Sequence, residues 1–284
     1  LSLLDDADAE IRVQALKVLS EAKPSQAISD KVAAQLTHEN LRVRTQAGIT
    51  LGKLGGKVAF AAFFRDAETE LRLPWLRHGL VSGLAGTQSS ADLLSTAQAK
   101  NGAEAVFAAL ALARQNSPLV AKLLTHPNPE VVVEAARAIH DDEGIPSAQT
   151  ELAEAFATTK LPFHAARRAL NANLRQGDEA SLRRILEWTL KQPAGAPLRD
   201  EALRALITFD QPPVLDLVDP GLRRAIRHRH PRLPLPHRLR PWLPPPRPAG
   251  PRAAAWCCAR RAWCAALTCA AARRARARPI CSAR

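Results

Sequence analysis

One stretch of this sequence, Leu123–Ile139, has the pattern of a helix end, a tight turn and the start of a second helix. Asn128 is a good N-cap, because its side-chain oxygen can accept a hydrogen bond from an unpaired amide of the first turn. Pro129 suits the first helical position, where no amide donor is needed. Apolar residues then recur at helical spacing from Val131 onward. A helix pair of this kind cannot cover its apolar faces alone and must stack on copies of itself.

Copies of the unit occur along the first 220 residues. Setting Ile11 on Val43 also places Arg12 on Arg44 and Leu19 on Leu51. The later positions equivalent to Ile11 are Leu71, Ala105, Val131, Phe163 and Leu198, so successive copies lie 26 to 35 residues apart. Variable spacing of this size favours helical hairpins with loops of changing length over a coiled coil, whose heptads do not drift.

Local signals predict where several of these helices begin and end. Ser29 and Asp30 are candidate caps for a helix over Lys31–Leu36, and Pro74 is expected near the start of another helix. Glycine at a helix C-terminus tolerates the left-handed backbone that often ends a helix. Gly177 directly follows residues 163–176 and is expected to end the helix that they form. Three further glycines, Gly52, Gly55 and Gly56, are expected to end the second copy.

The composition changes near Pro220. Residues 1–220 carry 24 Lys and Arg against 27 Asp and Glu, whereas residues 221–284 carry 16 Arg and no Lys, Asp or Glu. We therefore predict two parts: a helical-repeat domain of about seven pairs over residues 1–220, and an Arg-, Pro-, Ala- and Cys-rich tail over residues 221–284. The tail is interpreted as a shifted reading frame of a GC-rich gene. The alternative interpretation is a disordered basic extension.

Residues 3–19 resemble a HEAT repeat. The family pattern is Leu-Leu-x-x-Asp-x-Asp in the turn and then apolar-Arg-x-x-Ala-x-x-x-Leu in the second helix. Residues 3–8 read Leu-Leu-Asp-Asp-Ala-Asp, one residue shorter before the acids, and residues 11–19 match the helix part. The resemblance implies an all-α fold, a right-handed α-solenoid of HEAT-like helical hairpins, followed by the irregular C-terminal tail. The absence of Tyr and the low aromatic content also argue against a β-sandwich or barrel.

Residues 130–220 more specifically resemble the helical-repeat region of large multidomain haem-binding dehydrogenase-like proteins of planctomycetes. The matching segments are 130–141, 168–177 and 197–206. In that family a β-propeller precedes the repeats and a c-type cytochrome module follows them, so the resemblance implies an inter-module segment and a periplasmic or extracytoplasmic location. The haem motif Cys-x-x-Cys-His is absent here, so no haem ligand is predicted and no cofactor is expected in this segment.

The ends of the chain and its hydropathy give weaker indications. The sequence starts inside a repeat and contains no methionine, which favours a fragment of a longer protein. No cationic and apolar leader is visible. No apolar run reaches 18 residues, so no membrane span is predicted.

The best candidate interaction surface is Trp75 together with Arg72, Arg77 and His78. HEAT-like DNA glycosylases use an aromatic and basic surface in this manner. The acidic balance of residues 1–220 argues against a groove for phosphates, because non-specific nucleic-acid affinity depends on basic charge. Between the two interpretations we favour a Trp75 that is packed between repeats.

Other polar residues have ordinary structural explanations. Arg12, Arg44 and Arg72 could form an anion-binding ladder, but we favour a structural ladder in which they pair with turn acids such as Asp8. The run His140, Asp141, Asp142 and Glu143 could chelate a metal, yet a solvated helix-end loop is the simpler interpretation. The remaining candidates are the turn histidines His126 and His164 and the cysteines Cys257, Cys258, Cys264, Cys269 and Cys281, which contain no Cys-x-x-Cys pair.

The sequence contains no Gly-rich phosphate loop, nucleophile elbow or metalloprotease helix. No catalytic, cofactor-binding or metal-binding residue is therefore predicted. The favoured hypothesis is a non-catalytic scaffold that binds other proteins, within a larger dehydrogenase-like protein. The alternatives are a HEAT-like DNA glycosylase and a basic protein that binds nucleic acid through its tail.

Overall fold

The computed structural model describes residues 1–141, 145–213, 216 and 218. All of them belong to one compact unit, Leu1–Arg232, while the second unit, Leu233–Arg284, lies outside the described residues. Every regular element in the described part is a helix, which confirms the all-α prediction there. The predicted tail 221–284 and its cysteines also lie outside the described residues.

The α-helices are α1 (Ala9–Leu19), α2 (Gln26–Ala33), α3 (Leu41–Leu54), α4 (Ala67–Leu71), α5 (Pro74–Thr87), α6 (Ser90–Ala99), α7 (Ala103–Arg114), α8 (Pro129–His140), α9 (Gln149–Thr158), α10 (Phe163–Gln176), α11 (Glu179–Lys191) and α12 (Arg199–Ile207). The 3-10 helices are η1 (Ser2–Asp5), η2 (Ala34–Thr37), η3 (Phe60–Phe63), η4 (Pro118–Thr125) and η5 (Pro146–Ala148). No described helix combines the length and the apolar character that a membrane span requires.

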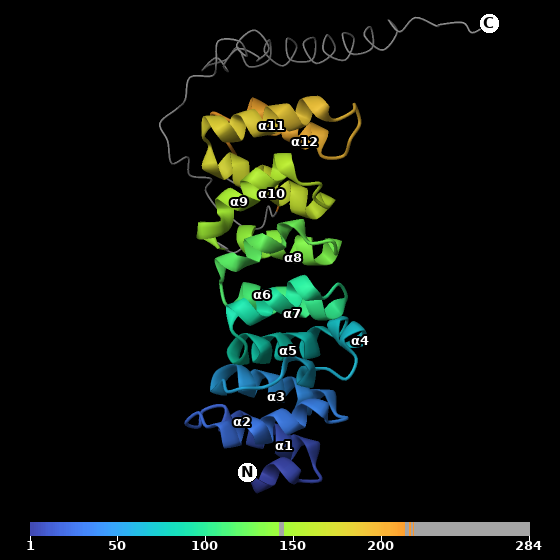
Figure 1. The fold of residues 1–284 in the computed structure, drawn as a ribbon, viewed down its shortest axis with the longest axis vertical. Helices are drawn as coiled ribbons and strands as arrows, with labels where there is room; N and C mark the ends of the chain where they lie inside the picture. The colour runs from blue at the N-terminus through green and yellow to red at the C-terminus, as the bar shows by residue number, and fades with distance from the viewer. Residues whose placement is uncertain (142–144, 214–215, 217, 219–284) are drawn as a thin grey trace, which may run out of the picture. The chain divides into compact units, whose positions relative to one another are not determined.

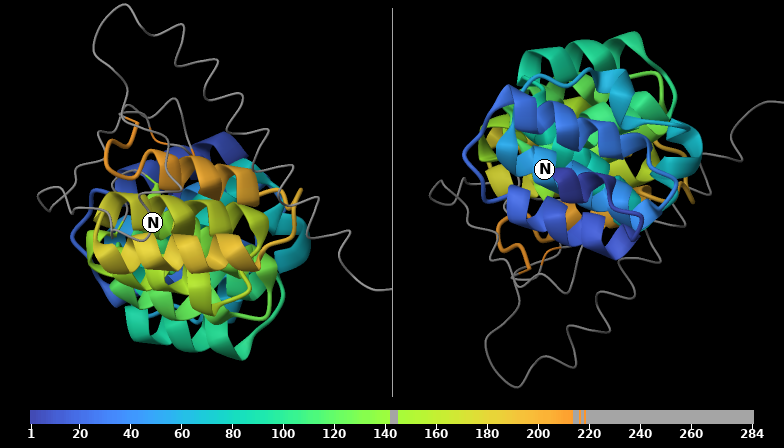
Figure 2. Two further views of the ribbon diagram at one scale, coloured as in Figure 1. Left: turned by 90° about the horizontal axis from the view of Figure 1, so that it is seen from above. Right: turned by 90° about the horizontal axis from the view of Figure 1, so that it is seen from below.

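These helices associate as consecutive pairs that stack in chain order (Figure 1). The pairs are η1 with α1, α2 with α3, α4 with α5, α6 with α7, η4 with α8, α9 with α10, and α11 with α12. One row consists of α1, α3, α5, α7, α8 and α10, and each of these helices packs on the next. In Figures 1 and 2 the helices lie across the direction in which the pairs follow one another. The core is therefore distributed along the row instead of gathered at one centre.

Capping residues explain most helix starts. The Asn128 side chain accepts a hydrogen bond from the Glu130 amide at 2.9 Å, and Pro129 is the first residue of α8, as predicted. Gly177, with φ 64°, ends α10 in the left-handed conformation, also as predicted. The side chains of Asp8, Ser25, Asn40, Asp66, Ser89 and Asp178 cap other helices in the same way as Asn128.

The helix predicted over Lys31–Leu36 begins earlier than expected. Ser25, and not Ser29 or Asp30, is the N-cap of α2, and its hydroxyl accepts a hydrogen bond from the Ile28 amide at 3.3 Å. Ser29 is buried and donates instead to the Gly55 carbonyl at 3.0 Å. The serine that we expected to cap this helix therefore ties α2 to the end of α3.

The third copy of the repeat has a different register from the predicted one. Leu71 is the last residue of α4 and does not correspond to Ile11 of α1. Arg77 stands four residues after the N-cap of α5, as Arg12 and Arg44 do in α1 and α3. The equivalence of Arg72 with those two arginines was therefore wrong, and Arg77 takes its place.

These three arginines form a structural ladder, but their partners are not the turn acids that we predicted. Each guanidinium donates to a backbone carbonyl of the segment before its own helix. The acceptors of Arg12, Arg44 and Arg77 are the carbonyl oxygens of Asp6, Leu36 and Leu71, at 2.5, 2.6 and 3.2 Å. Asp8 instead caps α1. Arg44 also pairs with Glu70 of the next repeat, with both side chains almost fully buried.

The contact between α3 and α5 depends on glycine. A Cβ atom built at Gly48 would lie 2.4 Å from the Gly79 carbonyl oxygen, and one at Gly86 would lie 2.4 Å from that of Gly52. No real side chain fits at such distances, so the two backbones touch along this seam. Gly52 therefore lies inside α3 and does not help to end it; Gly55 is the C-cap.

We predict that Gly79→Ala destabilises the protein. Alanine is normally about 1 kcal/mol more favourable than glycine inside a helix. Here its Cβ would lie 2.5 Å from the Thr45 carbonyl oxygen, so α3 and α5 must separate. The expected loss is about 1–3 kcal/mol in the free energy of unfolding, measured by urea denaturation.

The matched control is Ser95→Ala at an exposed position of α6, which gains helix propensity without a close contact. It is expected to leave stability unchanged or slightly raised. If Gly79→Ala were as stable as this control, backbone contact along the seam would be refuted.

Candidate functional site

Trp75 lies on the surface at the start of α5. Its side chain is 83% exposed, the highest value among the exposed large hydrophobic residues of the described chain. Pro74 begins the helix, and Leu76, which is 1% exposed, occupies the core position next to Trp75. The interpretation that we favoured, a Trp75 packed between repeats, is therefore wrong.

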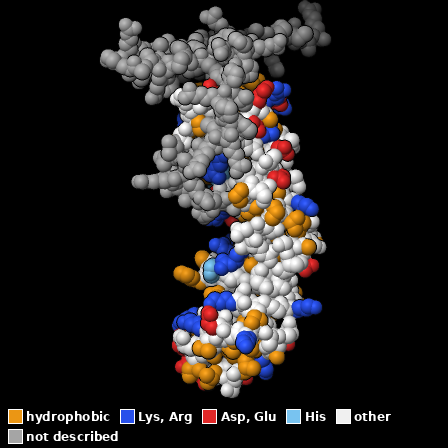
Figure 3. All heavy atoms as spheres, turned by 90° about the vertical axis from the view of Figure 1, so that its left-hand side faces the viewer, with side chains coloured by type: hydrophobic (Ala, Val, Ile, Leu, Met, Phe, Trp, Pro, Cys, Tyr) orange, Lys and Arg blue, Asp and Glu red, His pale blue; other side chains and the backbone are white. Residues whose placement is uncertain are grey.

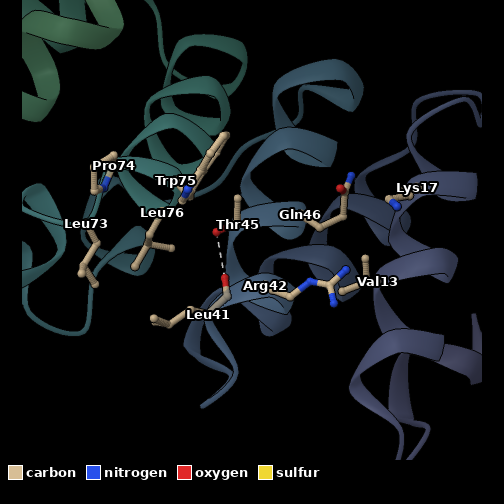
Figure 4. Close-up of a pocket in the computed structure, with 10 residues that line it drawn as sticks. All are labelled: Val13, Lys17, Leu41, Arg42, Thr45, Gln46, Leu73, Pro74, Trp75 and Leu76. Carbon is tan, nitrogen blue, oxygen red and sulfur yellow. Dashed lines mark hydrogen bonds between the residues drawn. The ribbon is translucent and has the colours of Figure 1, made fainter.

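Trp75 forms part of a cleft with a volume of about 470 Å³ (Figure 4). This volume lies within the usual range for ligand pockets, about 300–1,000 Å³. Its walls come from α1, α3 and the start of α5, three consecutive helices of one row. The lining residues are Val13, Lys17, Leu41, Arg42, Thr45, Gln46, Leu73, Pro74, Trp75 and Leu76.

The cleft combines apolar surface with positive charge. Leu41 is 47% exposed beside Trp75, so the apolar part is open to solvent. Arg42 extends from α3 toward α1, where its Nη1 lies 2.9 Å from Glu10 Oε2 (Figure 4). The Lys17 residue is exposed, and its side chain has no hydrogen bond or ion pair with the described residues. The face of the molecule that Figure 3 shows carries hydrophobic and basic side chains with a histidine beside them, and acidic side chains as well.

Only one of the four predicted surface residues lines this cleft. Arg72 and His78 are exposed near Trp75 in sequence but are not among the lining residues, and Arg77 donates to the Leu71 carbonyl. The sequence reading missed the contribution of α1 and α3. A usable signal existed in two i, i+4 pairs on those helices: Val13 with Lys17, and Arg42 with Gln46.

A second polar feature joins α8 and α10. His140 is 1% exposed, and its Nδ1 lies 2.9 Å from Asp141 Oδ1. Its Nε2 lies 2.8 Å from the Asn171 amide nitrogen. Arg168 holds the same aspartate with two bonds, Nε to Oδ1 at 3.0 Å and Nη2 to Oδ2 at 2.8 Å. The prediction of a solvated helix-end loop was therefore wrong for His140 and Asp141; Asp142 and Glu143 lie outside the described residues.

Arg175 and Asp216 extend this cluster. Arg175 donates to the His140 carbonyl at 2.9 Å and pairs with Asp216, which is 2% exposed. Asp216 Oδ2 also lies 3.6 Å from His140 Nε2. Residues 27 to 76 positions apart in the chain therefore meet in one network, and periodicity cannot reveal such a contact.

The cluster shifts the acidity of its members. Burial lowers the pKa of His140, and the hydrogen bond to Asp141 only partly opposes this, so the imidazole is neutral near pH 7. Burial alone would raise the pKa of Asp141, but the hydrogen bonds from His140 and Arg168 outweigh it and hold that pKa well below its usual range. Burial alone would raise the pKa of Asp216, but its interactions with His140, the Val218 amide and Arg175 outweigh burial and lower that pKa.

The other histidines among the described residues show no metal-binding arrangement. His126 accepts a hydrogen bond from the Asn128 amide at 3.0 Å, and its other ring nitrogen lies 2.9 Å from the Ala97 carbonyl. His38 accepts a bond from Asn40 in the same manner, at 2.9 Å. No group of three His, Cys, Asp or Glu side chains that could hold a metal ion occurs among the described residues. His126 thus joins the turn of its own repeat to the preceding one.

Comparisons with known proteins give no family for this chain. No family model matches it, and no curated protein sequence matches it. One solved structure, a crystal structure of an engineered protein from the Northeast Structural Genomics Consortium, is similar over 73% of this chain and 94% of its own. Its sequence is 20% identical and the TM-score is 0.32, a value too low to support an argument about fold or function.

We predict that Asp141→Asn weakens the contact between α8 and α10. The substitution removes the charge that binds Arg168 and His140 in a largely buried place, with an expected loss of about 2–3 kcal/mol in the free energy of unfolding. The control is Glu179→Gln, which removes an exposed i, i+4 pair with Arg183 and should cost no more than about 0.5 kcal/mol. Equal losses in urea denaturation would show that the cluster contributes no more than a surface ion pair.

We also predict a pH dependence from His140. Its folded pKa is lowered, so below the ordinary value of about 6.5 the unfolded chain takes up a proton that the folded chain does not. The contribution of His140 to stability is therefore full above about pH 6.5 and falls as the pH drops from there to 5. The His140→Gln variant should show a flatter profile over that range, and His164→Gln, at an exposed site, should keep the wild-type slope. Parallel wild-type and His140→Gln profiles would contradict this prediction.

Proposed function

We propose that the described helices form a right-handed α-solenoid of HEAT-like pairs that acts as a non-catalytic scaffold for binding other proteins. The observation that carries the proposal is the cleft at Trp75. A large, rigid aromatic side chain that stays exposed beside apolar and basic groups is typical of a protein-binding surface, where such residues contribute most of the affinity. Apolar surface exposed to water is unfavourable, and a bound partner would cover the exposed Trp75 ring.

The arrangement of the pairs supports the solenoid part of the proposal. Each pair contacts its neighbours in the chain, and the long-range polar bonds of the N-terminal pairs join adjacent pairs. A row of helices built this way offers one continuous surface to a partner. We further propose, on the family resemblance alone, that this scaffold lies between modules of a larger extracytoplasmic dehydrogenase-like protein that carries haem elsewhere.

A DNA glycosylase is the second candidate, because one cleft holds an aromatic side chain and two cations, Lys17 and Arg42. A glycosylase must extrude a base and act on it within a pocket. The lining of the cleft contains no Asp or Glu, so no carboxylate there is placed to act as a general base. Nucleic-acid binding through the basic tail is a third candidate, which depends on residues outside the described part.

The scaffold proposal predicts peptide binding at Trp75. A random peptide library displayed on phage would be selected against the immobilised full chain, with the Trp75→Ala chain as counter-selection. We expect enriched peptides that bind the wild type and lose about tenfold or more in affinity against Trp75→Ala. The control is Phe163→Ala, which removes another exposed aromatic side chain from α10 and should leave binding unchanged.

Release of a base from alkylated duplex DNA by the wild type, lost in Trp75→Ala, would instead establish the glycosylase. Selection of no peptide that depends on Trp75 would refute the scaffold role of this cleft.

A further inference from the structure

We infer that the cleft between α1, α3 and α5 binds an acidic peptide segment that carries one apolar anchor side chain. The inference rests on the proposed scaffold function and specifies the chemistry of the partner. Three properties of the cleft lead to it: an open apolar surface of limited size, two cations at its edge, and no carboxylate in its lining.

The apolar surface fits a single anchor. Trp75 and Leu41 are both exposed, 83% and 47%, and Val13 and Leu76 lie beneath them as buried residues. An aromatic or aliphatic side chain placed here would remove apolar area from water on both surfaces. The volume of about 470 Å³ is near the lower end for ligand sites, so it suits one or two side chains and not a whole helix face.

The charges select acidic neighbours for that anchor. Lys17 has no partner among the described residues, so a carboxylate beside it would form a new ion pair without breaking an old one. Arg42 is paired with Glu10 but remains 71% exposed, which leaves part of its guanidinium open to a second acceptor. A basic segment would be repelled by Lys17, and at Arg42 it would have to compete for Glu10.

Charge also excludes the chain's own C-terminal residues as the occupant. Residues 221–284 contain sixteen arginines and no Asp or Glu, so they repel the cations of the cleft. Nucleic acid is the less favoured polyanion. Two cations, one of them already paired, neutralise few phosphates, and only one aromatic side chain is available for stacking.

The test uses the full-length chain and fluorescein-labelled twelve-residue peptides, followed by fluorescence anisotropy. One peptide carries Asp and Glu around a central Leu-Phe pair, a second replaces the acids with Asn and Gln, and a third keeps the acids but replaces Leu-Phe with Ala-Ala. The third peptide measures how much the arginine-rich C-terminal residues bind acidic peptides by charge alone. A single-stranded oligonucleotide serves as competitor.

We expect the acidic anchored peptide to bind at least tenfold more tightly than either control peptide. Trp75→Ala should remove that advantage, and Lys17→Glu should weaken binding several-fold. Lys31→Glu, the same change of charge at an exposed position of α2, should not.

Tight binding of the neutral anchored peptide with the same dependence on Trp75 would refute the acidic preference while leaving the scaffold function intact. Failure of every peptide to depend on Trp75 would refute both proposals. Competition by the oligonucleotide that is lost in Trp75→Ala and Lys17→Glu would replace the peptide with a nucleic acid.

Discussion

The fold depends on the burial of each helix pair between the pair before it and the pair after it. No single pair encloses a core, because its apolar residues face outward on two sides. Nearest-neighbour packing along α1, α3, α5, α7, α8 and α10 supplies that cover. Where two backbones must touch, as at Gly48 and Gly79, the sequence has no side chain to separate them. Small residues are therefore as necessary to the stack as the buried leucines.

Polar ties follow the same nearest-neighbour pattern. Buried Arg44 closes its own turn through the Leu36 carbonyl and reaches forward to Glu70. In the C-terminal half, Asp141 and Arg168 link α8 to α10 in a similar manner, with the buried His140 beside them. These hydrogen bonds and ion pairs give partners to polar groups that packing buries. Removing one partner leaves the other unpaired in a poorly hydrated place.

The start of α8 was predictable from the sequence because the Asn128 side chain acts on its own backbone. The start of α2 was not, although Ser25 caps it in the same way. The prediction was wrong where a neighbouring helix decides the role of a residue. Gly52 is a residue type that often ends helices, but it lies inside α3 in the contact with α5. Arg72 is an arginine like Arg12 and Arg44, but it follows α4 and is not part of the ladder. Trp75 was identified as a candidate surface residue, whereas Lys17 joins it only because α1 and α5 lie on either side of α3.

The glycine seam bears on how the cleft would accept a partner. Thr45 lines the cleft, and its backbone lies against Gly79 in the seam, so the wall from α3 and the wall from α5 are fixed to one another within a single turn of helix. Walls held in this way lose little further freedom when they are occupied. The loss of conformational entropy on binding is then mainly that of the incoming segment. The shape of the cleft is already formed before a partner binds.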